Sequence, residues 1–307
     1  MSDFREFPDP TEIRHTIGAG GKFSLHNVSG DIRVRGADTE EAVVIARSSH
    51  GRADSLPLAV RRGEGSLEIE LSPKDPSFFG FGRRGVGSIE FDVTLPRGAR
   101  VDINAVSSDI EARGLVGDQE FRTVSGDMSL EQVAGRIDLT TVSGDISLQA
   151  EGSIEPRLAT TSGDIELTAP QVRGLQLRTV SGDAEVRAAF DPGSTHTVET
   201  VSGDASISAG SGLTVDVKRG IDLSGNGARQ RVVGDGSARL RFRSLSGDIH
   251  LEGGPVRQPN GPVAQPSAPA PRQTQGLNSL DILRALERGE IDVEEAARRL
   301  EGAGSRG

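Results

Sequence analysis

A Ser-Gly-Asp tripeptide, or a close variant of it, recurs along this 307-residue chain at nearly constant intervals. From Ser107 onward the copies start 18, 18, 19, 19, 21, 22 and 22 residues apart. A period of about 20 residues is typical of a solenoid, in which each repeat is one unit stacked on its neighbour. The repeat therefore predicts an all-β fold, a parallel β-solenoid (β-helix) with coils of roughly 18–22 residues. The copies begin at Ser29, Ser107, Ser125, Ser143, Ser162, Ser181, Ser202 and Ser246, with a degenerate Ser-Gly-Asn at Ser224.

Apolar residues fall at fixed positions relative to each corner serine. Positions three and five after it, as in Ile146 and Leu148, share one face of an extended strand. Positions four and one before it, as in Leu139 and Val142, are also apolar but differ in parity, so we expect a bend or bulge between them. Each coil should contain two strands of about five residues and a short third side that holds the corner.

Stacking of such coils brings like residues together. Neighbouring coils would pair in parallel with like residues ~4.8 Å apart. The threonine two places before the corner, as in Thr141, would then form a ladder in which each hydroxyl reaches its neighbour.

An antiparallel meander is the alternative architecture, with Ser-Gly as a tight hairpin turn. It predicts a second turn of similar chemistry in the middle of each repeat. Some repeats have such a turn, as at Ala134-Gly135, but the residues there vary whereas the corner does not. This difference favours the solenoid.

The chain divides into four regions. Residues 1–106 show strand patterns at irregular spacing and would start the solenoid, with an insertion or several degenerate coils between the first two corners; residues 107–252 form the regular array. Residues 253–276 are a proline-rich linker with too little apolar content to fold, so we expect disorder. Residues 277–302 have the pattern of a short helical hairpin. Its apolar anchors are Leu280, Leu283, Leu286 and Leu300.

Composition narrows the function classes. The chain has no cysteine, so it has no disulfide framework and no thiolate metal site. A net charge of −10 and an aromatic content of 3% argue against nucleic acid as a partner. The N-terminus lacks the apolar run of a signal peptide, and no stretch approaches the ~18 apolar residues of a membrane-spanning helix. We therefore expect a cytoplasmic protein.

The corner residues have structural roles of their own. Glycine supplies a positive φ, and the aspartate and serine side chains satisfy main-chain amides. The alternative is a calcium site, but carboxylates ~4.8 Å apart in water repel by only ~0.9 kcal/mol, so a solvated row needs no ion. Calcium also requires several converging oxygens. We expect no metal here. The residues of the alternative calcium site are Asp127, Asp145, Asp164, Asp183 and Asp204.

No arrangement of residues indicates catalysis. The five histidines are scattered without ligand spacing. Gly80–Gly85 matches a dinucleotide-binding fingerprint by letter, but a strand-like run rather than a helix follows it. We predict a protein that is not an enzyme and has no cofactor, and the sequence identifies no small-molecule substrate.

One glycine-rich loop combines aromatic and basic side chains. The plain interpretation is that its phenylalanines fold back on the end of the solenoid. The alternative is an exposed tip that contacts an anionic membrane surface as a peripheral protein, or a partner. The interaction candidates in this loop are Phe78, Phe79, Phe81, Arg83 and Arg84.

The Thr-Val-Ser-Gly-Asp-Ile pattern, seen at Thr141–Ile146 and, with Asn in place of Thr, at Asn27–Ile32, resembles the bacterial putative-adhesin family of β-strand-repeat proteins. This is a domain family of unknown function, and the resemblance covers roughly residues 12–252. It implies a β-solenoid without known catalytic residues and, in some relatives, an association with envelope-stress genes. The segment Ile282–Leu300 looks like the short helical modules called SHOCT-like domains.

Together these features predict a non-enzymatic cytoplasmic scaffold or protein-interaction module, linked through the resemblance to envelope stress. The solenoid would present a rigid face, and the helical hairpin would recruit a protein partner or self-associate. The alternative is a carbohydrate-active or carbohydrate-binding β-helix protein, which would need carboxylates, arginine and aromatic residues together on one coil face.

Overall fold

The computed structural model describes residues 3–49, 55–71, 88–219 and 229–253, and these segments contain strands and no helix. The prediction of an all-β solenoid is confirmed for this part of the chain. The predicted helical hairpin, residues 277–302, lies outside the described residues, as does nearly all of the predicted linker. In the part of the chain that the structure describes, no helix has the length and hydropathy needed to cross a bilayer.

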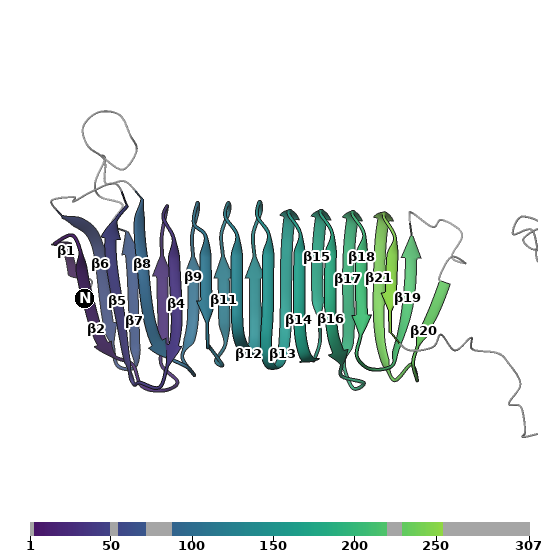
Figure 1. Ribbon diagram of the computed structural model, residues 1–307. Helices are drawn as coiled ribbons and strands as arrows, with labels where there is room; N and C mark the ends of the chain where they lie inside the picture. Colours follow the sequence, from purple (N-terminus) through teal and green to yellow (C-terminus); the bar gives the residue numbers. More distant parts are fainter. Residues whose placement is uncertain (1–2, 50–54, 72–87, 220–228, 254–307) are drawn as a thin grey trace, which may run out of the picture. The chain divides into compact units, whose positions relative to one another are not determined.

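Each regular coil consists of two strands, joined by the Ser-Gly-Asp corner at one edge and by a more variable bend at the other (Figure 1). The strands of successive coils build two sheet faces, which we call face 1 and face 2. Face 1 contains, in spatial order, β1 (Asp3–Phe7), β6 (Leu56–Gly63), β7 (Ser66–Leu71), β3 (Lys22–His26), β9 (Arg100–Asn104), β11 (Gln119–Arg122), the second halves of β12 (Met128–Thr140) and β13 (Ile146–Ser162), β15 (Gln176–Ser181), β17 (Thr195–Ser202), β21 (Ala238–Ser246), β19 (Leu213–Arg219) and β20 (Arg229–Val233). Face 2 contains β2 (Thr11–Thr16), β5 (Glu41–Ser48), β8 (Ile89–Pro96), β4 (Ile32–Ala37), β10 (Ile110–Arg113), the first halves of β12 and β13, β14 (Ile165–Val172), β16 (Ala184–Phe190), β18 (Ala205–Ala209) and β22 (Ile249–Glu252).

Pairing between coils follows the repeat. Ile110 pairs with Met128, Met128 with Ile146, and Ile146 with Ile165, all in parallel strands. This confirms the predicted parallel register and excludes the meander for the array. The two-strand coil differs from the expected three-sided one, because the corner is too short to form a side. Two strands, β12 and β13, continue through the variable bend and are therefore 13 and 17 residues long rather than about five.

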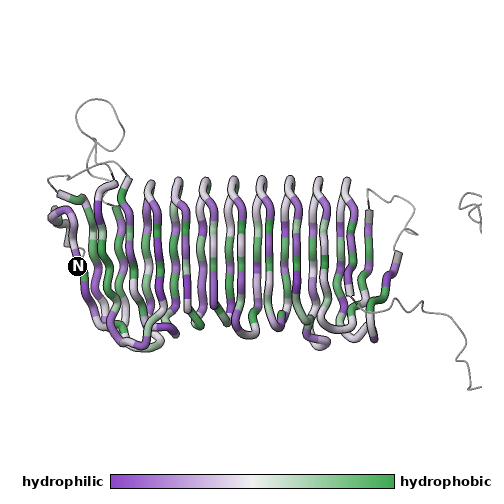
Figure 2. Tube along the Cα trace, viewed as in Figure 1, coloured by the Kyte–Doolittle hydropathy of each residue, from purple (hydrophilic) through white to green (hydrophobic). Residues whose placement is uncertain are grey.

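The core lies between the two faces. Alternate residues of each strand point inward, and the apolar ones form one continuous cluster that includes the fully buried Phe23, Phe91, Phe121 and Phe242. Figure 2 shows the resulting alternation of hydrophobic and hydrophilic residues along the strands.

The residue immediately before each corner does not join this core. In β15, Leu177 and Thr179 are buried, whereas Val180 is 45% exposed. The strand keeps its alternation up to the threonine, and its register with β13 shows no bulge between Leu177 and Thr179. Our expectation of a bend between the two apolar positions was wrong, because the threonine and not the valine occupies the inward position.

The buried threonines stack as expected, but their hydroxyls bond differently. Thr160 pairs with Thr179, and Thr179 with Thr200. Thr123 Oγ1 donates to the carbonyl of Ser125 at 3.2 Å, and Thr160 Oγ1 donates to that of Gly144 at 3.3 Å. These two hydroxyls therefore reach main-chain carbonyls and not the neighbouring hydroxyl.

The 78-residue interval between the first two corners forms the N-terminal end of the stack. β3 and β4, which flank the Ser29 corner, pair directly with β9 and β10 of the Ser107 coil. β7 and β8 pair with the opposite sides of β3 and β4, and in the sequence residues 72–87 connect them. The strands β1, β2, β5 and β6 extend the two faces in antiparallel pairings. The interval thus holds one further coil without the corner motif, covered by antiparallel strands.

At the other end, spatial order departs from sequence order. The coil of the Ser246 corner stacks on that of Ser202, and β19 and β20 lie beyond it on face 1. Arg231 is opposite the buried Val215, so its side chain starts on the core side, and its Nη1 donates to the carbonyl of Ile249 on face 2 at 3.3 Å. An inward charged residue at a terminal strand opposes further edge-to-edge stacking. The degenerate corner at Ser224 lies outside the described residues.

Candidate functional site

The corner aspartates form a continuous ladder along one edge of the stack. Oδ1 of Asp127 accepts the main-chain N–H of Asp145 at 2.8 Å, and Oδ1 of Asp145 accepts that of Asp164 at 2.8 Å. Each carboxylate thereby links its coil to the next one. The same contact joins Asp109 to Asp127, Asp164 to Asp183, Asp183 to Asp204, and Asp204 to Asp248.

This ladder gives a structural role to all five residues of the alternative calcium site. One oxygen of each carboxylate is engaged by an amide of the next coil. In the described part of the chain, the corner carboxylates do not form a cluster of three converging ligand atoms.

We expect the ladder to depend on the acceptor oxygen and not on its charge. Asp145→Ala should lower the free energy of unfolding by ~0.5–1.5 kcal/mol, the contribution of one hydrogen bond. Asp145→Asn, which keeps the Oδ1 acceptor, should have a smaller effect, and calcium added to the metal-free wild type should leave its Tm unchanged. Denaturant melts measure the free energies of unfolding, and thermal melts measure the Tm. A calcium-induced rise in Tm that Asp145→Asn abolishes would contradict the structural role.

A row of exposed apolar side chains runs beside the ladder, and we call it the corner-edge row. It consists of the residue immediately before each corner serine, and its seven apolar members have exposed fractions from 42% at Val28 to 55% at Leu245. The main chain holds the row in place, since the N–H of Ser125 donates to the carbonyl of Val106 at 2.8 Å, a contact that recurs along the array. In stacking order the row contains Val28, Val106, Val124, Val142, Thr161, Val180, Val201 and Leu245.

The outer surfaces of the two faces carry ion pairs between coils. Glu199 lies between Arg178 and Arg243, at 3.0 and 3.3 Å. Such exposed pairs contribute little stability individually. A shallow groove on face 2 is lined by charged residues that include Arg33, Glu111, Arg113 and Glu131, and no aromatic residue lines it.

His196 is a buried titratable residue whose role is structural. Its side chain is fully buried and lies edge-to-face against Phe190, with ring centroids 5.0 Å apart. Nδ1 accepts the main-chain N–H of Leu175 at 3.3 Å, so Nε2 carries the proton and donates to the carbonyl of Asp191 at 3.1 Å. Burial lowers the pKa of His196 below its ordinary value. The neutral ring therefore joins two coils through hydrogen bonds.

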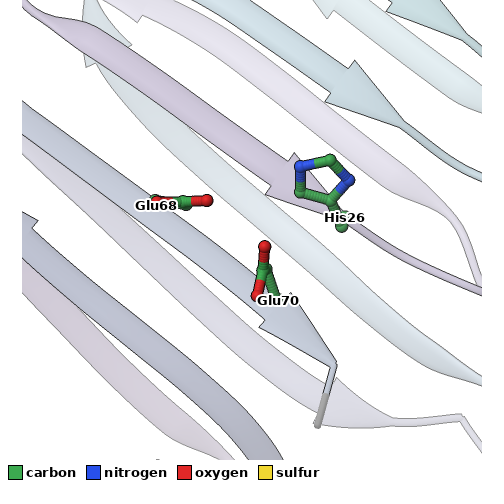
Figure 3. A group of neighbouring side chains, drawn as sticks. All are labelled: His26, Glu68 and Glu70. Carbon is green, nitrogen blue, oxygen red and sulfur yellow. The ribbon is translucent and has the colours of Figure 1, made fainter. Parts of the chain in front are cut away.

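A cluster of potential metal-ligating side chains was missed by the sequence interpretation. His26 in β3 and Glu68 and Glu70 in β7 point toward one another on the outer surface of face 1 (Figure 3). Each offers a ligand atom, and these atoms all lie within 4.8 Å of one another. His26 and Glu68 are 42 residues apart, so no local spacing could reveal this group.

The remaining site predictions concern segments outside the described residues. These residues are Phe78, Phe79, Phe81, Arg83 and Arg84 in the glycine-rich loop, and Leu280, Leu283, Leu286 and Leu300 in the predicted hairpin.

The model of one protein family, Toastrack DUF4097, matches residues 21–249, which include the whole corner ladder. The chain belongs to this Toastrack family. The family-level resemblance inferred from the corner motif is thereby confirmed, and a β-solenoid-like fold is typical of the Toastrack domain. No curated protein matches the chain.

Several solved structures are similar to this Toastrack chain. A putative adhesin from Bacteroides fragilis is 12% identical with a TM-score of 0.38, and the match covers 79% of this chain and 97% of that one. A putative lipid binding protein from Parabacteroides distasonis is 11% identical with a TM-score of 0.35, and the match covers 79% of this chain and 96% of that one. A putative cell adhesion protein from Clostridium sporogenes is 10% identical with a TM-score of 0.23, covering 80% and 99%.

Proposed function

We propose that this chain is a non-enzymatic interaction protein whose corner-edge row binds an apolar segment of a protein partner. The observation that carries this proposal is the row itself, which holds seven valine or leucine side chains, each at least 42% exposed. Four of them lie on consecutive coils, and Thr161 separates these four from the other three. A contiguous exposed apolar surface is uncommon on a monomeric protein and is typical of an interaction site. Hydrogen bonds between corners hold the row rigid, so a partner binds without ordering it first.

In this proposal the solenoid acts as a cytoplasmic scaffold, and the predicted SHOCT-like hairpin recruits a second partner or self-associates. Contact of the Phe78–Arg84 loop with an anionic membrane would add a peripheral attachment. The link to envelope stress derives from the family resemblance alone.

The alternative carbohydrate-binding function has less support. Ligand sites of that kind use exposed aromatic side chains together with a few polar groups. The phenylalanines of the solenoid are instead used in its core, and no aromatic residue is among the large exposed hydrophobic residues of the described segments.

Substitutions in the corner-edge row test the proposed function. The full-length chain with a photo-crosslinking residue in place of Val142 identifies the partner, and the affinity of the identified partner is then measured. We expect Val124→Thr combined with Val142→Thr to weaken binding about tenfold or more, because two apolar side chains lose their favourable burial. Thr161 already occupies the row in one coil, so the fold should tolerate threonine there.

Val116→Thr is the matched control, since Val116 is 46% exposed but lies outside the row. Equal affinity of the double variant and the control would contradict docking at the row. If the row variants bound normally and a variant truncated after Gly253 lost binding, the interaction would be assigned to the C-terminal segment instead.

A further inference from the structure

We propose that His26, Glu68 and Glu70 form a binding site for a zinc-type divalent transition-metal ion on face 1. This site is separate from the corner-edge row and from the aspartate ladder. In the described segments, these three side chains bring their potential ligand atoms within 4.8 Å of one another.

The geometry follows from strand register. β3 and β7 pair in parallel, with His26 beside Glu70 and Ser24 beside Glu68. The inward residues of these strands, such as Leu25 and Ile69, are fully buried, so the intervening positions put all three ligand side chains on the same outer surface. Ser24 occupies the fourth corner of this group, beside Glu68, and is itself 7% exposed.

The separation of the ligand atoms suits a small ion. The three atoms lie within 4.8 Å of one another, compared with ~3.3 Å between the ligand atoms of a tetrahedral zinc site. Small side-chain rotations close this difference, since all three residues are only half-buried. Three protein ligands leave the fourth position to water or to a group on a bound partner.

The ligand types select the class of metal. An imidazole with two carboxylates suits zinc and similar transition metals, whereas calcium and magnesium prefer oxygen ligands alone. The aspartate ladder, which contains oxygen ligands only, therefore differs in chemistry from this cluster.

Arg61 in β6 orients the two carboxylates from the far side of β7. Its Nη1 lies 3.0 Å from Glu68 Oε1, and its Nη2 lies 3.3 Å from Glu70 Oε2. A partner of this kind fixes the orientation of metal-binding carboxylates, as outer-shell residues do in metal sites. Glu68 contacts Arg61 through Oε1, whereas both oxygens of Glu70 do so, its Oε1 at 3.5 Å from Nη1, so a bound ion would share Glu70 with Arg61. Two carboxylates with one guanidinium give the cluster a net charge of −1 when His26 is neutral.

Zinc titration of the metal-free full-length chain tests the site. Isothermal titration calorimetry with zinc chloride should show one equivalent bound, with binding at least ~10-fold weaker in His26→Ala and in Glu68→Gln. His250→Ala is the matched control, because it removes an exposed histidine from β22 at the other end of the stack, and it should bind as the wild type does. Calcium and magnesium should bind more weakly than zinc.

Two further measurements make the result decisive. Circular dichroism and melts without metal check that the variants fold, and zinc should raise the Tm of the wild type more than that of His26→Ala. Cobalt(II) should give a visible absorption spectrum that both ligand variants lose. A wild type that binds no zinc, or a folded His26→Ala or Glu68→Gln variant that binds as tightly as the wild type, would overturn the proposal.

Discussion

Replacing Gly144 with alanine is expected to lower the free energy of unfolding by about 3–5 kcal/mol. Gly144 is the central residue of a corner and has a φ of +149°, a conformation that side-chain-bearing residues rarely adopt. A Cβ at this position would lie 2.1 Å from the carbonyl oxygen and 2.7 Å from the carbonyl carbon of Gly126 in the adjacent coil. Both atoms belong to a main chain held by the ladder, so the coils themselves would have to separate.

Gly20→Ala is the matched control, because Gly20 has no positive φ and a Cβ there would meet nothing within 4 Å. Its free energy of unfolding should be unchanged or higher by up to ~1 kcal/mol. Guanidinium melts of the two variants and the wild type give the comparison. Equal midpoints for Gly144→Ala and Gly20→Ala would show that the corners do not need glycine.

Replacing Asn27 with alanine is expected to lower the free energy of unfolding by about 2–4 kcal/mol, since it leaves several buried polar atoms without partners. Asn27 occupies the position of the buried threonine in the first corner and is 4% exposed. Its Nδ2 lies 3.1 Å from the carbonyl of Gly30, 3.2 Å from that of Ile89 and 3.3 Å from Ser108 Oγ. The side chain therefore connects three coils at the point where the regular corners end.

Asn104→Ala serves as the control for this variant. Asn104 is half-buried, and its Nδ2 donates to Asp102 at 2.8 Å, so the change should cost ~1 kcal/mol or less. Asn27→Thr, which introduces the residue found at this position in five of the other corners, should fall between alanine and the wild type. If Asn27→Ala and Asn104→Ala lowered the free energy of unfolding equally, the hydrogen bonds of Asn27 would not be what stabilises the first corner.

The stacking of the regular coils could be predicted from the sequence because its causes are local and repeated. Alternation such as Ile146 and Leu148 marks an inward strand face, and recurrence of the corner at a constant interval places like residues side by side. The aspartate ladder follows from the same register, with a carboxylate and an amide present in every coil. The sequence also indicated that the interval after Ser29 differs from the array.

Other features depended on contacts that no local pattern encodes. The orientation of Val142 was one of them. Unbroken alternation from Leu139 places Thr141 inward and Val142 outward, but whether the strand stays unbroken up to the corner depended on its pairing with the neighbouring coils. The order of strands at the C-terminal end was another, since β21 enters between β17 and β19 although β19 precedes it in the sequence.

The sequence by itself determined the solenoid, its period and its parallel register, because each follows from short-range alternation and a glycine corner repeated in every coil. Only the tertiary structure decided which valines form an exposed row, how the two ends of the stack are covered, and that His26 meets Glu68 and Glu70. The physical reason is that these features rest on pairings between strands far apart in the chain, and such pairings are selected by the packing of the whole stack. In the corner repeats, in contrast, every copy contains the alternation and the glycine corner that determine how it pairs with the next coil.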